Sequence, residues 1–387
     1  MNKNVHSTRI GRSVRLGAVL IAVFSLSLLL TWGLTRGDSR VIVTVAGTGV
    51  AGFSGNGGLA ADAQLNTMQG LTVDGAGNLY IAEVTNHVIR RVDASGHIST
   101  VAGLGPDQAG FNGDNQPAAQ AKLAAPSDVA LDRAGNLYIA DNGNNRIRRV
   151  DSSGMIATVA GGGSPADGLG DGGPATAAAL KNPCAIVFDA AGNLYIADAG
   201  NLRIRRVDAT TGIITTIAGS GVFGFSGDGG PATSAKFKNL SDLAIGPAGD
   251  IFVADTFNNR VRRISTDGII TTVVGNGTFL VNGPEDLKDG GPAVDAVVRW
   301  PFGLAFESAG NLLIAENGSN RIRRVNVSGI IGTVAGSGDP RIGGDGGDGG
   351  PADQAKLNGP SGVIVDALGN IYISDSRNFR VRKVNAQ

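Results

Sequence analysis

Short apolar runs separated by glycine-rich polar stretches recur along most of this chain, and residues 135–161 show the pattern in full. An apolar run at 136–140 is followed by a polar turn at 141–145, a run of alternating basic and apolar residues at 146–150 and another apolar run at 155–160. Runs of this length, bounded by Gly, Asn and Asp, predict β-strands. The first run is apolar on both faces, as in a strand covered on either side, whereas the alternation at 146–150 predicts a half-exposed strand.

Copies of this segment follow one another at a nearly constant interval. Each begins with a Gly-Asn or Gly-Asp pair, and the spacings between successive pairs are 58, 57, 57, 61 and 59 residues. The glycines are Gly77, Gly135, Gly192, Gly249, Gly310 and Gly369. A further apolar run precedes each of them, so each of the six copies supplies four strands. Four-stranded units at this period predict an all-β fold, a six-bladed β-propeller with four-stranded blades.

The two ends of the repeat region indicate how the ring closes. Residues 41–46 match the fourth strand of a copy, and residues 380–384 match a third strand. We therefore expect the N-terminal strand to complete the last blade, so that the propeller occupies residues 41–387 and closes without a disulfide.

A different pattern precedes the propeller. Residues 1–15 carry four basic residues and no acid, residues 16–35 are 20 uncharged residues, and residues 36–40 form a short linker. As a helix, residues 16–35 would span roughly 30 Å, the thickness of the hydrocarbon core of a bilayer. Because more basic residues precede this segment than follow it, we expect an uncleaved single-pass anchor in the cytoplasmic membrane, with residues 1–15 inside and the propeller on the extracytoplasmic side. The alternative is secretion after signal cleavage, although residues 31–33 make a poor cleavage site.

Composition and charge narrow the class of partner. Glycine accounts for 61 of the 387 residues, and the excess lies in loops where positive φ angles are needed. Basic and acidic residues number 33 each. The isoelectric point near 6.8 argues against nucleic acid as a partner, because nucleic-acid-binding domains are usually basic. The single cysteine, Cys184, starts an apolar strand, where a small buried side chain is expected rather than a nucleophile.

The longest loop of each copy contains a second repeated motif. In five copies a proline opens a segment of small residues that ends in an apolar residue, and we expect a short helix whose last side chain plugs the blade below it. An acid or asparagine stands just before this segment, at Asn56, Asp114, Asp171, Asp228, Asp289 and Asp348. We expect these side chains to cap the helix and its turn. The alternative is calcium, with Asp345, Asp348 and Asp353 as the best local ligand candidates; the fold requires no other cofactor.

Two further sets of charges recur. Asp141 and Arg146 flank the turn between the second and third strands, and because a hairpin brings such ends together we expect a charge-assisted pair there. In the first copy Glu83 faces Val88 instead. The acids that end the first strands, such as Asp132, precede a tight turn and are expected to cap its backbone. Repetition in nearly every copy favours a structural role for both sets over a catalytic one.

The motifs Gly-Asn-Leu-Tyr-Ile-Ala-Asp, Asn-Asn-Arg-Ile-Arg-Arg-Val and Gly-Phe-Ser-Gly-Asp-Gly-Gly-Pro-Ala-Thr resemble NHL repeats of bacterial and teneurin-like propellers, over residues 41–387. The resemblance implies a binding or scaffolding module for a protein or carbohydrate ligand, here tethered to the membrane on its extracytoplasmic side. Relatives of such repeats include a metal-dependent amidating lyase, and similar folds include calcium-dependent lactonases. A metal-dependent enzyme of the lactonase or lyase type is therefore the alternative function.

Two features count against the enzyme. The histidines are His6, His87 and His97, and the first precedes the predicted anchor, so the propeller cannot assemble a three-histidine zinc site. The first strands, taken to begin near Val129 and Leu243, also lack the inward Glu, Asn and Asp set that the resemblance to a lactonase would require.

One face of the predicted propeller carries the long loops, because the connections between blades and the turns after the second strands emerge on the same side. Function on a rigid scaffold usually lies in the longer and more variable loops, and here the fifth and sixth copies depart most from the repeat. We expect Phe279, Trp300 and Arg341 to contact the ligand on this face, with one aromatic as an apolar anchor if it is exposed. The alternative is that both aromatics lie in the core.

Overall fold

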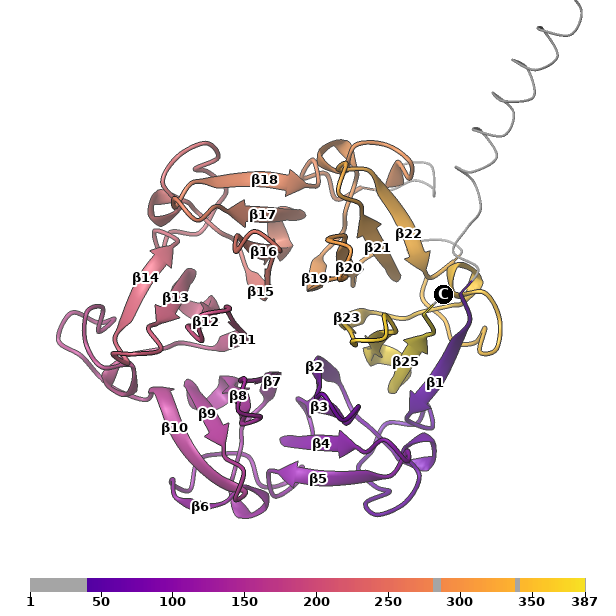
Figure 1. Cartoon of the computed structure of the whole chain (residues 1–387), viewed down its shortest axis with the longest axis horizontal. Helices are drawn as coiled ribbons and strands as arrows, with labels where there is room; N and C mark the ends of the chain where they lie inside the picture. The colour runs from indigo at the N-terminus through magenta and orange to yellow at the C-terminus, as the bar shows by residue number, and fades with distance from the viewer. Residues whose placement is uncertain (1–39, 281–286, 338–341, 387) are drawn as a thin grey trace, which may run out of the picture. The chain divides into compact units, whose positions relative to one another are not determined.

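The structure is a computed structural model that describes residues 40–280, 287–337 and 342–386, all within one compact unit, Asp38–Gln387. Six β-sheets stand around a central channel as the blades of a propeller (Figure 1). In blades 1 to 5 the chain runs from the strand nearest the channel to the strand at the rim. The predicted all-β, six-bladed propeller with four-stranded blades is confirmed.

The six blades are numbered in chain order, and the strands of each are named from the channel outward. Blade 1 contains β2 (Met68–Val73), β3 (Leu79–Glu83), β4 (Val88–Val92) and β5 (Ile98–Ala102), and blade 2 contains β7 (Pro126–Leu131), β8 (Leu137–Asp141), β9 (Arg146–Val150), β10 (Met155–Gly161) and, at its rim, the short β6 (Gln116–Pro117). Blade 3 contains β11 (Pro183–Phe188), β12 (Leu194–Asp198), β13 (Arg203–Val207) and β14 (Ile214–Ala218), and blade 4 contains β15 (Leu240–Ile245), β16 (Ile251–Asp255), β17 (Arg260–Ile264) and β18 (Ile270–Val274). Blade 5 contains β19 (Pro301–Phe306), β20 (Leu312–Glu316), β21 (Arg321–Val325) and β22 (Ile331–Ala335), and blade 6 contains β23 (Pro360–Val365), β24 (Ile371–Asp375), β25 (Arg380–Val384) and β1 (Ile42–Ala46).

Blade 6 takes its rim strand from the start of the propeller, as the ends of the repeat region predict. β1 pairs antiparallel with β25, with Ile42 opposite Val384 and Val43 opposite Lys383 (Figure 1). The amide of Ile42 also donates to the carbonyl of Gly350 at 3.1 Å, which joins β1 to the loop that leads into blade 6. The ring is therefore closed by hydrogen bonds between segments from opposite ends of the propeller.

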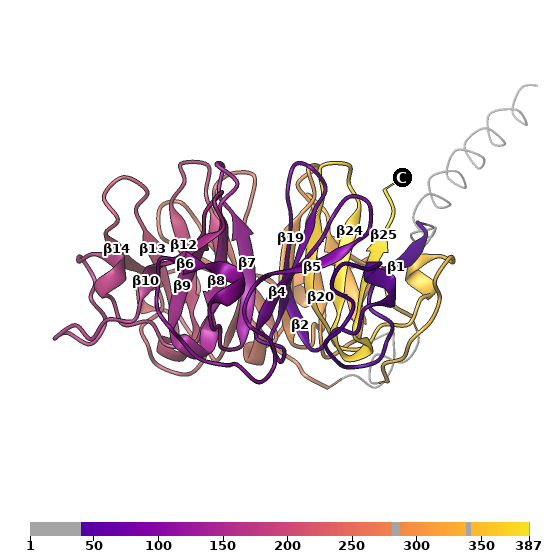
Figure 2. The same cartoon turned by 90° about the horizontal axis from the view of Figure 1, so that it is seen from below.

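The two faces of the propeller differ in the length of their connections (Figure 2). The turn face carries the tight turns after the first and third strands of each blade, such as the turns at 132–136 and 151–154. The loop face carries the connections between blades and the turns between the second and third strands, which lie at the lower edge in Figure 2. Four of those turns contain single turns of 3₁₀ helix: η3 (Asn142–Asn144), η5 (Ala199–Asn201), η7 (Thr256–Asn258) and η11 (Ser376–Asn378).

Each connection between blades also contains a turn of 3₁₀ helix that begins at an alanine. These turns are η1 (Ala60–Asp62), η2 (Ala118–Gln120), η4 (Ala175–Ala177), η6 (Ala232–Ser234), η9 (Ala293–Asp295) and η10 (Ala352–Gln354). Proline stands before five of them with ψ between 128° and 135°, an extended conformation that lets it pair with the rim strand, as Pro174 does with Ile213. The predicted helix is thus three residues long and begins after the proline. The predicted plug is confirmed, because the apolar residue after each turn is buried: Leu65, Leu123, Leu180, Phe237, Val298 and Leu357.

A buried arginine lies at the centre of the third strand of every blade, so the prediction of a half-exposed strand is wrong at this position. The six arginines are Arg90, Arg148, Arg205, Arg262, Arg323 and Arg382. In blade 2, Nη1 of Arg148 lies 3.4 Å from Oδ2 of Asp141, and its Nη2 donates to Oδ1 of Asp114 at 2.9 Å. The connection between blades covers the strand and supplies the second carboxylate, which is why the arginine is buried.

The predicted pair of Asp141 with Arg146 is wrong, because Asp141 pairs with a different arginine. The two residues lie opposite each other in the strand register, but Nη1 of Arg146 donates to the carbonyl of Asn144 and its guanidinium stacks 4.1 Å from the ring centroid of Phe111. The guanidinium of Arg148, two residues further on, reaches the buried carboxylate instead. The first copy is not an exception, because Glu83 pairs with Arg90 at 3.2 Å.

The acids before the 3₁₀ turns bind these arginines and do not cap a helix, contrary to expectation. The carboxylate of Asp114 accepts hydrogen bonds from Arg148 and from the hydroxyl of Thr158. The capping role predicted for Asp132 is confirmed, since its Oδ1 accepts from the amides of Ala134 and Asn136, both at 2.9 Å.

The predicted membrane helix, residues 16–35, lies outside the residues that the structure describes. Within the described ranges, no helix is long and apolar enough to cross a membrane.

Candidate functional site

The inner strands of the six blades enclose a cavity of about 410 Å³ on the propeller axis. Its wall is apolar toward the turn face, where Leu131, Phe188 and Phe306 end their strands. Most of its polar side chains lie near the loop face, where the inner strands begin: Gln69, Ser127, Asp128, Cys184, Ser241, Asp242 and Ser361. The cavity is therefore of mixed polarity, and its polar end adjoins the longer loops.

The hydroxyl and thiol groups at this end join neighbouring blades. Oγ of Ser127 donates to the carbonyl of Cys184 at 3.0 Å, and the thiol of Cys184 donates to the carbonyl of Leu240 at 2.9 Å. Burial and nearby carboxylates raise the pKa of the Cys184 thiol well above its ordinary value. A thiol held neutral and engaged in this way fits the structural role expected for it, although it lines the channel instead of lying in an apolar strand core.

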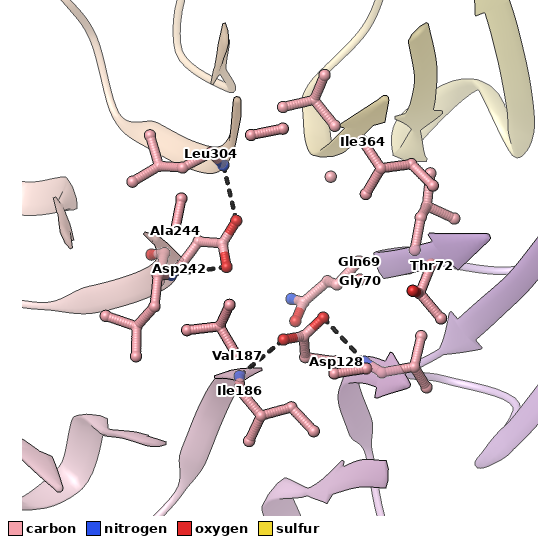
Figure 3. Close-up of a pocket in the computed structure, with 18 of the residues that line it drawn as sticks. Gln69, Gly70, Thr72, Asp128, Ile186, Val187, Asp242, Ala244, Leu304 and Ile364 are labelled. Carbon is pink, nitrogen blue, oxygen red and sulfur yellow. Dashed lines mark hydrogen bonds between the residues drawn. The ribbon is translucent and has the colours of Figure 1, made fainter. Parts of the chain in front are cut away.

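Two carboxylates point into the channel from alternate blades, Asp128 on β7 and Asp242 on β15 (Figure 3). Asp128 accepts from the amides of Val129 and Ile186, both at 2.8 Å. Asp242 accepts from the amides of Leu243 and Leu304, both at 2.7 Å. In each case one oxygen binds its own strand and the other binds the inner strand of the next blade, so the carboxylate bridges two blades at the channel wall.

Burial raises the pKa of both carboxyl groups. The pKa of Asp242 rises to about 7, and that of Asp128 rises well above its ordinary value, through burial first and then through repulsion by Asp242. None of the residues that line the cavity is basic, so no cation of the wall offsets the two acids. The polar end of the channel therefore holds protons close to neutral pH and would attract a cationic or hydrogen-bonding group.

Two first strands carry inward acids that were not predicted from the sequence, although no Glu or Asn among the described residues lines the cavity beside them. The prediction placed the starts of β7 and β15 near Val129 and Leu243. They begin at Pro126 and Leu240, and a shift of register just after these residues turns Asp128 and Asp242 toward the axis. The signal was present as Pro-Ser-Asp and Leu-Ser-Asp at equivalent places in two copies. The other blades have Gly70, Ala185, Gly303 and Gly362 there.

The glycines at this position follow from close packing between inner strands. A Cβ atom on Gly362 would lie 2.2 Å from the carbonyl oxygen of Gln69 in blade 1, and one on Gly70 would lie 2.0 Å from Oδ1 of Asp128. In blades 2 and 4 a carboxylate at this position joins the inner strand to that of the next blade. Only these two blades contribute carboxylates at this position.

The aromatic residues predicted to contact a ligand lie together on the loop face. The rings of Phe279 and Trp300 are 5.4 Å apart between centroids, and the guanidinium of Arg299 lies 4.7 Å from the centroid of Phe279. Phe279 is exposed and Trp300 is half-buried, so neither is a core residue. Arg341, the third predicted contact, lies outside the described residues. Ligand binding by these residues stays a prediction.

The residues named for calcium are engaged with arginines or apart from one another. Asp348 accepts from Nε of Arg382 at 3.0 Å, and Asp345 lies 3.5 Å from Nη1 of Arg380. Asp353 lies in η10. Within the described ranges, no group of three or more His, Cys, Asp or Glu side chains could hold a metal ion. The two propeller histidines lie on opposite faces, with His87 accepting from the amide of Ala125 on the loop face and His97 beside Asp93 on the turn face.

Replacing Asp242 with asparagine should flatten the dependence of stability on pH. Because the pKa of Asp242 is about 7 in the folded protein, the carboxyl keeps its proton up to about that pH, whereas the unfolded chain releases it near the ordinary pKa of 3.8. This stabilisation is complete below the unfolded pKa and is lost as the pH rises through the folded pKa, so the wild type should lose on the order of 2–3 kcal/mol between about pH 5 and pH 8 through this group. Urea unfolding at several pH values measures it.

The difference between wild type and Asp242→Asn is the diagnostic quantity, because Asp128 and other buried acids titrate in both proteins. Asp107→Asn, which removes an exposed carboxylate outside the channel, is the control, and its pH profile should differ from that of wild type less than the profile of Asp242→Asn does. Parallel pH profiles for wild type and Asp242→Asn would show that the channel carboxyl titrates as an ordinary aspartate.

Comparisons with known proteins agree with this architecture. Residues 104–167 and 164–226 match the family model of the teneurin NHL domain, and residues 357–384 match that of the NHL repeat. Human Teneurin-4 is 31% identical over 357 residues, a match that covers 84% of this chain but 12% of Teneurin-4. This chain thus corresponds to a small part of that relative.

Solved structures show the same fold at low sequence identity. A structural genomics protein of unknown function from Bacteroides thetaiotaomicron superposes with a TM-score of 0.65 at 18% identity, covering 89% of this chain and 75% of that one. A streptogramin B lyase has a TM-score of 0.51 at 14% identity, covering 83% of this chain and 94% of the lyase. Together with the repeated motifs and the six blades, the matches to the NHL and teneurin models show that this chain belongs to the family of NHL-repeat β-propellers.

Proposed function

We propose that this chain is a binding or scaffolding propeller, tethered to the cytoplasmic membrane by residues 16–35 on its extracytoplasmic side, that takes a protein or carbohydrate ligand at the loop face. One observation carries the proposal. Every described phenylalanine that is more than a third exposed lies in a connection between blades or in a turn after a second strand: Phe111, Phe223, Phe225, Phe257 and Phe279. Exposed aromatic side chains gathered on one face of a domain mark an interaction surface.

Site-specific cross-linking on the full chain tests which face binds. A photoreactive residue in place of Thr85 or Thr278 reports on the loop face, and one in place of Ser153 or Ser328 reports on the turn face; all four side chains are exposed. In cells that make the full chain, we expect adducts with extracytoplasmic proteins or glycans from the loop-face positions alone. Adducts from the turn face alone, or none from either face, would refute the proposal.

The same cells test the tether. Protease added from outside should remove the propeller, and N-terminal sequencing of the intact chain should find a start before Leu16. A mature chain that starts near Leu34 would instead show secretion after signal cleavage.

The second candidate, a metal-dependent enzyme of the lactonase or lyase type, draws support from the channel carboxylates alone. Asp128 and Asp242 are oxygen ligands of the kind that calcium prefers, in a cavity large enough for a small substrate. Calcium added to the full chain should then raise the melting temperature, and Asp242→Asn should abolish the rise. An unchanged melting temperature favours the binding proposal.

A further inference from the structure

Six large apolar residues lie on the loop face in the turn of blade 4 and in the connections before and after that blade, and we call this set the aromatic seam. It comprises Phe223, Phe225, Phe257, Phe279, Leu280 and Trp300. Phe223, Phe257 and Leu280 are 64%, 53% and 75% exposed. Phe223 and Phe225 precede blade 4, Phe257 lies in the turn η7 of that blade, and the other three residues lie in the connection to blade 5.

Hydrogen bonds and ring contacts hold the parts of the seam in place. Nδ2 of Asn258 donates to the carbonyl of Gly224 at 2.8 Å, which fixes the Phe257 turn against the loop between Phe223 and Phe225. The amide of Trp300 donates to Oδ1 of Asn259 at 3.2 Å, and Trp300 stacks on Phe279. The seam is therefore a preformed surface built from three separate loops.

Phe257 and Trp300 depart from the repeat, whereas Phe225 occupies the position of Phe53 and Phe111. Phe257 occupies the position of Gly143, Gly200 and Gly318 in blades 2, 3 and 5, where a Cβ atom would come within 3.0 Å of the preceding connection. An exposed phenylalanine there is not required by the fold, because three blades are built without a side chain at this place.

Trp300 departs from the repeat in its backbone. It has a φ angle of 47°, and the equivalent residues are Thr67, Ala125, Asn182, Asn239 and Gly359. The left-handed conformation is less favourable for a bulky residue than for glycine, because the Cβ atom crowds the neighbouring carbonyl oxygen. The backbone conformation of the half-buried Trp300 is therefore unfavourable for its residue type. Residues held in such conformations gather at ligand-contacting sites.

The border of the seam is cationic. Lys236 and Lys238 take part in no ion pair within the described part of the chain, and Lys236 lies beside the Phe223 loop, where a Cβ atom on Gly224 would be 3.4 Å from its Cδ. The guanidinium of Arg260 lies 4.0 Å from the ring centroid of Phe225 and donates to the carbonyls of Asn258 and Asn276. Arg260 is thus held by backbone carbonyls, whereas the two lysines are available to a carboxylate from outside.

We propose that the aromatic seam binds an acidic segment of a protein partner, with at least one large apolar side chain of the segment seated among the aromatic rings. The proposal rests on the proposed function, whose loop face it narrows to one place and one partner chemistry. Apolar anchors surrounded by complementary charge are the usual composition of a binding hot spot and its border.

Selection from a displayed library of short random peptides on the full chain tests the partner chemistry. Enriched peptides should be net acidic and contain an aromatic or large aliphatic residue. Phe257→Gly, which installs the residue of three other blades, should weaken these peptides by about tenfold, a change of about 1.4 kcal/mol. The double variant Lys236→Glu/Lys238→Glu should weaken them at least as much, and more so at low salt. Arg377→Gly, the equivalent change in blade 6, should leave their affinity unchanged.

Several results would overturn the proposal. These are enrichment of neutral or basic peptides, equal affinity for wild type and Phe257→Gly, and self-association of the wild type that Phe257→Gly abolishes, which would assign the seam to a second copy of the chain. Cross-linking keeps the two proposals apart. If adducts form at Thr85 but the seam selects no acidic, apolar peptides, the proposal for the seam is refuted and the proposed function stands. If adducts form on the turn face alone, both proposals are refuted.

Discussion

Replacing Arg148 with methionine should lower the free energy of unfolding by about 3–5 kcal/mol, the usual cost of removing one partner from a buried ion pair. The side chain of Arg148 is fully buried and contacts the carboxylates of Asp141 and Asp114 and the carbonyl of Gly113. Methionine fills a similar volume, so most of the loss comes from the carboxylate of Asp141, which is also fully buried and would keep no cation. Urea unfolding of both proteins measures the difference.

The loss should depend on pH in a definite direction. Burial already raises the pKa of Asp141 to about 6 in the wild type, with Arg148 opposing the rise. Without Arg148 the folded pKa must lie higher still, so the folded variant keeps its proton over a wider range than the unfolded chain. Its stability is then retained at low pH and lost as the pH rises through the folded pKa. The difference in the free energy of unfolding between wild type and Arg148→Met should therefore be smaller near pH 5 than near pH 8.

The neighbouring substitution Arg149→Met is the control. Arg149 is half-buried and stands on the other face of β9, so its replacement should cost less than about 1 kcal/mol. Equal losses for the two variants, or a gap that does not change with pH, would contradict the assignment of Arg148 as the partner of Asp141.

A chain that begins at Gly47 should melt at least about 5 °C below one that begins at Asp38, because it lacks β1. The missing strand carries Ile42 and Ala46, both fully buried, and pairs along β25. Loss of this burial and pairing is worth on the order of 5 kcal/mol, and each kcal/mol lowers the melting temperature by about 1–2 °C in a domain of roughly 350 residues. The truncated chain also leaves β25 as an open edge, which should promote aggregation.

Complementation separates a missing strand from general damage. A synthetic peptide of residues 40–46 in excess should restore part of the melting temperature of the truncated chain, whereas the same peptide with Ile42→Asn should not. Equal melting temperatures for the two chains without peptide would contradict closure of the ring by β1.

The repeat in the sequence was sufficient to predict the blades, their number and their closure. The strand signals are local: each run of apolar residues is bounded by turn residues, and the period of about 57–61 residues leaves no other grouping of strands. The role of Asp132 was also predictable, because its two acceptor bonds go to residues no more than four positions away. Local contacts of this kind depend on neighbouring residues alone.

The candidate sites were predicted in part. Phe279 and Trp300 were identified because their copy departs from the repeat, and they do lie together. Phe257 was missed although it also departs from the repeat, since a single residue in a short turn is a weaker signal than a long insertion. Asp128 and Asp242 were missed because the register shift that turns them inward is a property of strand pairing.

The sequence by itself thus determined the architecture, the turns and the burial of the plug residues, because these follow from periodic apolar patterning and from hydrogen bonds within a few residues. Tertiary structure decided which charges meet. The partner of Arg148 from the loop, Asp114, is 34 residues distant, and the carboxylate of Asp128 accepts from the amide of Ile186 in the next blade, 58 residues away. The aromatic seam likewise combines three loops. Such contacts depend on how one blade packs against the next, and that packing cannot be predicted from the pattern within a single repeat.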